Sequence, residues 1–211
     1  MKINKIFLVL ITITAMLSCK NTHKEKNVIT KNSVVINEII LPNHPLWLLN
    51  RLALNKTNEN LKQSNKQVFT LSRTSTTETA YASVNNIPVV FGNHYRASVL
   101  VRKGDLLGGF FGLRIIGEYP NRADAVFDLE NGLMKEVVDV GEFFNGEAKI
   151  EDIGEGWFKC SLIAEVNSNK MKIILGPTSG LGKTITWEGT TNEKCSVYII
   201  PSSLVLEELA Q

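Results

Sequence analysis

From residue 66 onward, short runs of alternating apolar and polar residues follow one another, with Gly, Pro, Asn and Asp between them. Alternation at every second position places one set of side chains on each face of a β-strand, and turn residues end each run. A long run with the 3.6-residue period of an amphipathic helix does not occur. We therefore predict an all-β chain with strands at residues 66–72, 79–84, 94–104, 109–118, 123–130, 133–140, 147–154, 156–166, 170–176, 183–189, 195–200 and 203–209.

The predicted strands have one apolar side and one charged side. In residues 94–104, Tyr95 and Val99 share one side, whereas Arg96 and Arg102 share the other. This is the pattern of an antiparallel sheet that packs on a core with one face and meets water with the other. Many short strands at regular spacing predict a sandwich or a barrel.

Turn signals and one ambiguous segment complete the reading of the chain. Asn-Gly occurs at residues 131–132 and 145–146, and it predicts a hairpin at each place, because both central residues of a type I′ turn need positive φ. The segment HPLWLLNRLALNKT, residues 44–57, is compatible with one or two helical turns or with a strand.

The N-terminus combines a basic start with a short apolar run. Lys2 and Lys5 precede IFLVLITITAM, residues 6–16. A segment that spans a bilayer needs about 20 residues, so this run predicts an export signal. The small Ser18 precedes Cys19 at the point where the run ends.

The stretch MLSC resembles the lipobox of bacterial lipoproteins, in which the cysteine becomes the lipidated first residue. It departs from that pattern at Met16, where Leu is preferred, and at Leu17, where a smaller residue is preferred. The alternative is an ordinary cleaved signal with an incidental cysteine. The resemblance implies a protein anchored through Cys19 to a bacterial outer membrane or cell surface.

The chain then divides by composition. We expect a signal peptide at residues 1–18, a flexible tether at 19–44 and one folded domain at 45–211, because KNTHKEKNVITKNS is polar and cannot bury a core. The lysines of the tether suit an anionic membrane surface or a solvated linker equally well. The net charge of +2 is of mixed sign, so nucleic acid is not expected as a partner.

Cys160 and Cys195 fall in predicted strands of the domain. An exported protein can keep a disulfide, and two buried free thiols are the alternative, because cysteine is often simply buried. Sequence does not place their Cα atoms within bonding range of each other, so both alternatives stay open.

The stretch GPTSGLGKT, residues 176–184, is similar to a nucleotide-binding loop but departs from it. The motif G-x-x-x-x-G-K-[ST] requires glycine where Pro177 stands, and Pro177 has no amide proton to give a phosphate. The residues that follow, TITWEG, alternate like a strand, whereas the motif opens a helix. We expect a hairpin loop and no bound nucleotide.

Several stretches, taken in order, resemble a known family. HYRASVLVRKG, AVFDLENG, AKIEDIGEGWFKCSL and YIIPSSLVLEE are similar to successive strands of the jelly-roll, carbohydrate-binding-module-like domains of phage tail fibres and secreted bacterial proteins. The resemblance covers residues 66–209 and implies an antiparallel two-sheet jelly-roll sandwich without shared catalytic residues. PSSLVLEE departs from the closing W-G-A-Q pattern, which puts the binding role of that pattern in doubt.

The resemblance leads us to expect non-catalytic glycan binding. Sugars are held by aromatic rings and by planar polar side chains. Core packing is the favoured alternative for Trp187, because large aromatic side chains are mostly buried, and Arg114 either faces solvent or lines a groove. The candidate ligand-binding residues are Trp187, Tyr119, Tyr198, Arg96, Arg114 and Asp124.

Catalysis has little support in the sequence. The histidines are scattered, no metal-ligand spacing is present, and we expect no cofactor, no metal and no enzymatic activity. Glu118, Asp124 and Asp128 can in principle supply a glycosidase pair, although charges on a solvated face explain them as well. A structural or assembly lipoprotein that contacts another protein is the second expectation, and a polysaccharide-degrading enzyme is the third.

Overall fold

The computed structural model describes residues 33–62, 64–106, 109–134, 136–180 and 184–210. The predicted signal peptide and Cys19 lie outside these residues. Residues 32–211 form one compact unit. None of the helices in the described part of the chain is long and apolar enough to cross a membrane.

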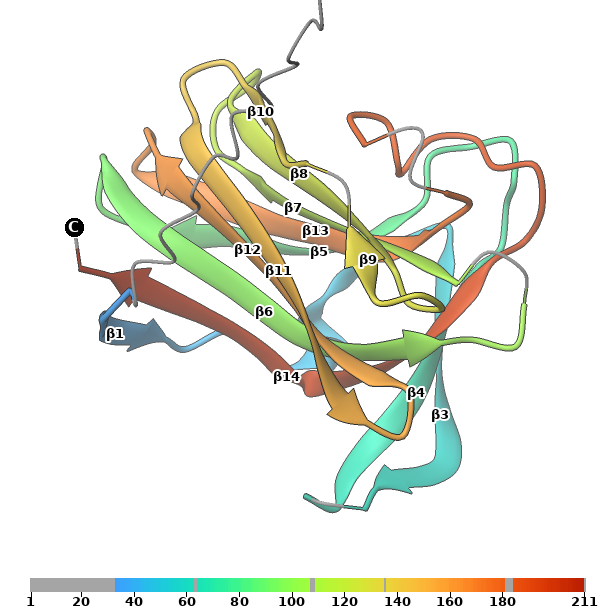
Figure 1. Cartoon of the computed structure of the whole chain (residues 1–211). Helices are drawn as coiled ribbons and strands as arrows, with labels where there is room; N and C mark the ends of the chain where they lie inside the picture. Colours follow the sequence, from blue (N-terminus) through green and yellow to red (C-terminus); the bar gives the residue numbers. More distant parts are fainter. Residues whose placement is uncertain (1–32, 63, 107–108, 135, 181–183, 211) are drawn as a thin grey trace, which may run out of the picture. The chain divides into compact units, whose positions relative to one another are not determined.

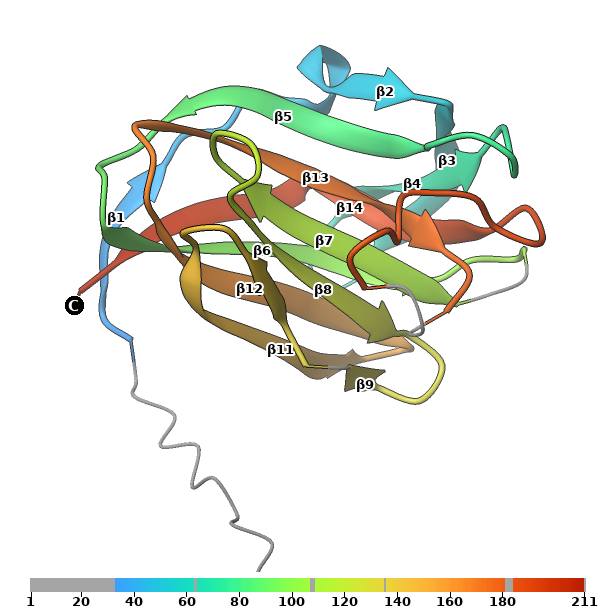
Figure 2. The ribbon, with the colours of Figure 1, turned by 90° about the horizontal axis from the view of Figure 1, so that it is seen from above.

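The described strands form two antiparallel sheets that pack face to face, which confirms the predicted all-β two-sheet sandwich (Figures 1 and 2). Sheet A has the order β11-β12-β6-β14-β4-β3, with β1 beside β14, and sheet B has the order β10-β8-β7-β13-β5-β2, with β9 beside β8. The strands of sheet A are β1 (Val35–Ile39), β3 (Leu52–Leu61), β4 (Lys66–Arg73), β6 (Asn93–Lys103), β11 (Phe144–Gly154), β12 (Trp157–Val166) and β14 (Ser196–Leu209). Those of sheet B are β2 (Leu48–Asn50), β5 (Tyr81–Pro88), β7 (Phe110–Ile116), β8 (Arg122–Asp128), β9 (Leu133–Met134), β10 (Val138–Val140) and β13 (Lys170–Thr178).

The core lies between the two sheets and uses the apolar side of each strand. Tyr95 and Val99 of β6 face Phe111 and Leu113 of β7 within one buried cluster. Burying a large apolar side chain contributes about 1.5–3 kcal/mol. The alternation seen in the sequence therefore selects which face of each sheet turns inward.

Some predicted strands differ from those observed. Residues 184–189 form turns where a strand was predicted, and the two runs 195–200 and 203–209 join in the single strand β14. Residues 44–57 contain a 3₁₀ turn at His44–Leu46, followed by β2 and the start of β3. Residues 35–39, within the expected tether, form β1, which pairs with β14.

One of the two hairpin predictions is confirmed, because Asn131-Gly132 lies in the turn that joins the antiparallel strands β8 and β9. The other needs correction. Asn145-Gly146 lies inside β11 at an irregularity in its pairing with β12, so it forms a bulge and not a turn. The two-residue turn lies at Glu155-Gly156, where φ is 54° and 74°, between Gly154 and its partner Trp157. Positive φ at both central residues is what a type I′ turn needs, and a glutamate at the first of them gives no sequence signal for it.

Both described cysteines are free and buried, as in the alternative of two buried thiols. The strand register explains why no bridge forms. Cys160 pairs with Val99 of β6, whereas Val197 pairs with Lys103, so Cys195 lies roughly 20 Å away along the strand direction. A disulfide requires Cα atoms within about 7 Å.

Candidate functional site

Between β13 and β14, residues 184–189 lie over the outer face of sheet B and bring Trp187 onto β7. A Cβ atom at Gly112 of β7 would lie 2.2 Å from the Trp187 ring, so only glycine admits the indole there. Ile116, Val126 and Ile174 surround the ring, and Trp187 is 1% exposed. The core alternative therefore describes Trp187, and it is not the exposed stacking platform that the glycan hypothesis expected.

A network of buried charges lies beside this indole. Arg114 donates from Nε to Asp124 Oδ1 over 2.5 Å, and its two terminal nitrogens reach the Glu188 carboxylate at 2.7 and 2.9 Å. Trp187 donates from Nε1 to Asp124 Oδ1 over 3.1 Å, and Arg122 Nε lies 3.2 Å from Oδ2. Arg114 thus lines neither a groove nor a solvated face. Its side chain is buried and joins Asp124 of β8 to Glu188 of the loop.

Burial and charge oppose each other in this network. Burial raises the pKa of Asp124 to about 6, although Arg114 and Arg122 act to lower it. Burial by itself would lower the pKa of Arg114, but Glu188 and Asp124 outweigh it and the pKa is raised. The Arg114 guanidinium therefore remains charged, while the burial of the Asp124 carboxyl brings its pKa close to neutral pH.

A second buried arginine, Arg73 at the end of β4, holds the same loop from another side. It is 2% exposed and donates to the carbonyl oxygens of Glu78, Glu188 and Gly189. Burial lowers the pKa of its guanidinium. Glu188 is thus held twice, through its carboxylate by Arg114 and through its carbonyl by Arg73, which fixes the conformation of the loop around it.

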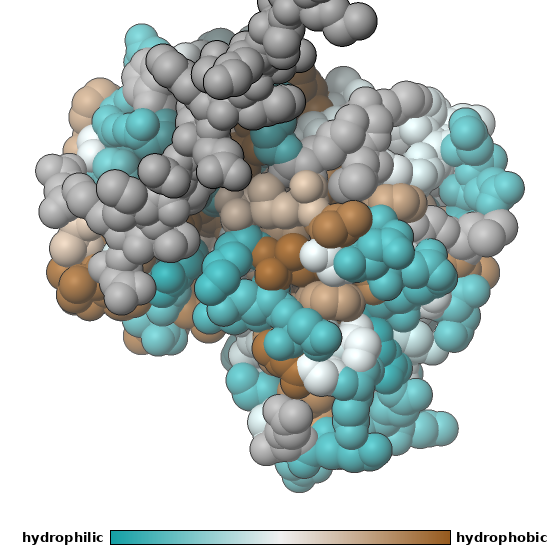
Figure 3. All heavy atoms as spheres, in the orientation of Figure 1, coloured by the Kyte–Doolittle hydropathy of each residue, from teal (hydrophilic) through white to brown (hydrophobic). Residues whose placement is uncertain are grey.

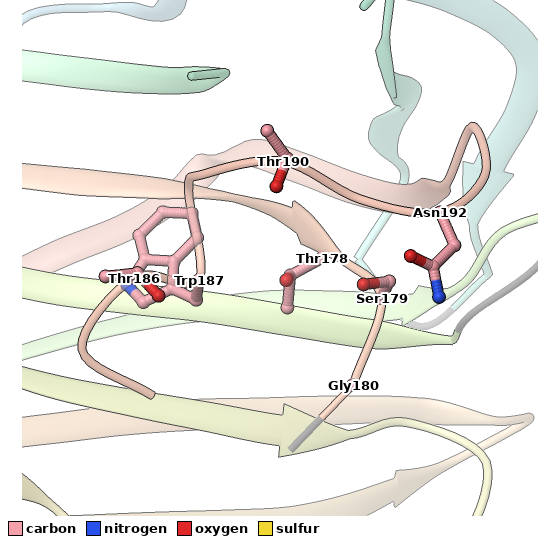
Figure 4. A pocket seen from close by; sticks show the side chains of 7 residues that line it. All are labelled: Thr178, Ser179, Gly180, Thr186, Trp187, Thr190 and Asn192. Atoms are coloured by element: carbon pink, nitrogen blue, oxygen red, sulfur yellow. The ribbon is translucent and has the colours of Figure 1, made fainter. Parts of the chain in front are cut away.

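The fixed loop and the end of β13 enclose a small hollow of about 170 Å³ (Figure 4). Figure 4 shows Ser179 and Asn192 close together at one side and Trp187 at the other. Its lining offers hydroxyl and amide groups, which both donate and accept hydrogen bonds, and the described residues add no charged side chain. The lining residues are Thr178, Ser179, Gly180, Thr186, Trp187, Thr190 and Asn192.

The six predicted site residues do not form one site. Arg114, Asp124 and Trp187 lie together under the loop. Tyr198 lies on sheet A, donates to Asp105 over 2.5 Å and carries Arg102 over its ring at 4.6 Å. Arg96 is also on sheet A, paired with Glu207 at 2.7 Å, and Tyr119 is 86% exposed in the loop between β7 and β8.

Sequence reasoning missed the polar residues that line the hollow. Thr178 and Ser179 stand in the stretch before Trp187 that predicts a hairpin loop, and Thr190 and Asn192 stand in a polar stretch after it without a recognised signal. Among the described residues that follow the nucleotide-like stretch, 184–189 form turns, so neither the helix that the motif requires nor the predicted second strand is present there. Lys183 itself lies outside the description.

Solved structures of other proteins are similar to this chain at low sequence identity. No protein-family model and no curated protein matches the sequence. A solved structure of a Clostridium thermocellum endo-1,4-β-D-xylanase, with CBM22-1 and GH10 modules and xylohexaose, covers 83% of this chain at 11% identity with a TM-score of 0.44. An arabinose-bound GH51 α-L-arabinofuranosidase covers 82% at 10% identity with a TM-score of 0.44.

Both similar proteins are carbohydrate-active by their names. The chain spans 28% of the xylanase structure and 27% of the arabinofuranosidase structure.

Proposed function

We propose that the domain is a non-catalytic glycan-binding module and that the hollow beside Trp187 is its binding site. The observation that carries the proposal is a polar, preshaped hollow on a loop that two buried arginines hold in place. A loop fixed before binding loses little conformational entropy when a ligand arrives. The preorganised hollow therefore suits a weakly interacting ligand such as a sugar.

The chemistry of the lining supports a sugar more than a charged ligand. Each sugar hydroxyl donates and accepts a hydrogen bond, and the side chains of Ser179, Thr186 and Asn192 can do the same. The indole of Trp187 gives the hollow one apolar wall. Because the ring is almost wholly buried, recognition rests on hydrogen bonds and edge contacts and not on stacking across its face.

We further propose that the module is displayed on a membrane-anchored lipoprotein with Cys19 as the lipidated residue. The support is the position of Cys19 directly after the apolar run, in a stretch that resembles a lipobox. A role in protein assembly is the second candidate, favoured by exposed apolar residues at one end of the sandwich.

A glycan array followed by calorimetric titration tests the site. We expect Asn192→Ala to weaken binding of the best array ligand about two- to tenfold, because one lost hydrogen bond to an uncharged group contributes about 0.5–1.5 kcal/mol. Asn43→Ala is the matched control, since Asn43 is exposed as Asn192 is but lies outside the hollow. Equal affinities of the two variants would place the glycan site elsewhere, and an array without any ligand would refute glycan binding.

A further inference from the structure

Six exposed large apolar side chains gather at one end of the sandwich, here called the apolar end. Phe91 is 59% exposed, Tyr119 86% and Val34 64%. Exposed apolar groups scattered singly are ordinary, but a cluster on one surface usually marks an interaction site. The apolar end consists of Val34, Val35, Ile36, Val90, Phe91 and Tyr119.

The strand register places these residues together. The β5–β6 loop with Phe91 follows Pro88, which pairs with Lys170, the first residue of β13. The β7–β8 loop with Tyr119 follows Ile116, which pairs with Lys172. Both loops therefore leave the sandwich at the N-terminal end of β13, as Figure 2 shows.

The start of β1 belongs to the same end. Val35 pairs with Leu209 of β14, and Leu209 pairs with His94, at the start of β6 just after the Phe91 loop. Figure 3 shows hydrophobic atoms at the lower left of the molecule, where β1 lies in Figure 1. The exposed aliphatic side chains of Val34, Val35 and Ile36 thus lie at the same end of the sandwich as the two aromatic ones.

The chain that reaches this end indicates what covers it. Residues 20–32 join the predicted lipid site at Cys19 to Ser33, the residue before Val34, a span of at most about 50 Å when fully extended. This segment holds Lys20, Lys24, Lys26 and Lys31 against the single acid Glu25. Basic residues beside a lipid anchor are attracted to anionic headgroups, so lipid anchor, basic segment and apolar end follow one another along the chain.

We propose that the apolar end docks on the surface of a lipid bilayer, with Phe91 and Tyr119 at the level of the headgroups. Aromatic side chains favour that level, and an apolar face beside a basic segment suits the interface of an anionic membrane. The inference rests on the proposed membrane anchoring. It orients the domain, because the hollow lies beside Thr178, the last residue of β13, at the opposite end of the strand from Lys170.

Vesicle flotation of the polypeptide from residue 20 onward tests the docking without the lipid or the apolar run 6–16. This polypeptide contains the whole compact unit, and near-ultraviolet circular dichroism verifies its folding. With vesicles of phosphatidylethanolamine and phosphatidylglycerol, we expect a measurable bound fraction. Phe91→Ser with Tyr119→Ser should lower the vesicle partition coefficient about tenfold, because the change removes both exposed aromatic groups from the apolar end.

The control pair is Leu106→Ser with Leu133→Ser, since both leucines are exposed and adjoin the strand ends beside Thr178. We expect this pair to float as the unchanged polypeptide does. Absent flotation, or an equal effect of the two pairs, overturns the docking. Sedimentation equilibrium tests the alternative of a dimer. If the polypeptide dimerises without binding vesicles, and only the Phe91/Tyr119 double variant is monomeric, the docking is overturned and the apolar end is an interface between two copies. Failure of lipidation at Cys19 is read separately, from fractionation of the full chain.

Discussion

Single residues decide how the loop between β13 and β14 sits on sheet B. Gly112 leaves room for the Trp187 ring on β7, and the indole nitrogen donates to the buried Asp124. In the sequence, Trp187 shares parity with Ile185, which favours the core over a ligand platform. Parity along a strand does not apply here, because residues 184–189 form turns. The indole of Trp187 is buried because Gly112 on β7 leaves room for it, and not because of the sequence pattern around Trp187.

Trp187→Ala should lower the free energy of unfolding by about 3–5 kcal/mol, the usual effect of removing a buried Trp or Phe from a core. Thermal melts and urea unfolding measure the change. Ile185→Ala in the same loop is the control, because Ile185 is 43% exposed, and it should shift stability by no more than about 0.5 kcal/mol. Near-equal melting temperatures for the two variants would contradict the burial of the indole.

At the scale of elements, the sequence predicts the strands in which apolar and polar residues alternate clearly. It does not predict the strands that form only because they pair with another strand. Strands β6 and β12 follow the predicted runs closely, because their inner side chains enter one core. Strand β1 is short and mostly exposed, so its formation depends on pairing with β14 and leaves little periodicity to detect. The candidate site was predicted only in part for the same reason. The pairing of Arg114 with Asp124 across β7 and β8 is a register effect, and the hollow depends on a loop that residues distant in sequence hold.

The stability of the contact between sheet B and the loop that contains Trp187 should depend on pH through Asp124. Its pKa is raised to about 6 from the ordinary 3.8, so the folded state binds this proton more tightly than the unfolded state does. The group's stabilising contribution is therefore fully present below about pH 3.8 and is lost as pH rises toward 6. Asp124→Asn keeps the shape but removes the titration.

The unfolding free energy of the unchanged protein, minus that of Asp124→Asn, should decrease between pH 4 and pH 7. Urea unfolding of both proteins across this range gives the difference, and the subtraction cancels the other titrating groups. A difference that is constant or increases with pH would show that the ion pair with Arg114 outweighs the burial of the carboxylate.

At the scale of the whole molecule, the sandwich separates its two candidate surfaces. The hollow lies at one end of β13 and the apolar end at the other. The sequence predicted the two-sheet architecture from alternation and spacing, but not this separation, because it follows from the order in which the strands are laid in each sheet. On the proposed function, ligand recognition and membrane attachment do not compete for the same surface.

Cys19→Ser in the full chain should release the protein from the membrane fraction or leave its signal uncleaved, because the acyl chains supply the attachment. Fractionation of cells, with mass spectrometry of the N-terminus, distinguishes the two outcomes. Ser18→Thr, a change beside the cysteine that preserves it, controls for disturbance of the segment. A variant that matures normally and stays in the membrane would refute the lipoprotein proposal.

The pairing of β1 with β14 has a mechanical consequence. On the proposed anchoring, a large polysaccharide held at the hollow pulls against the membrane through the start of β1, and the pull runs along the strands. Hydrogen bonds between antiparallel strands lie across the strand direction, so such a pull loads the bonds between residues 35–39 and 206–209 together, in shear. A pull from the side would instead peel β1 away one bond at a time. The direction in which the chain meets the sheet thus determines how much force the attachment can bear.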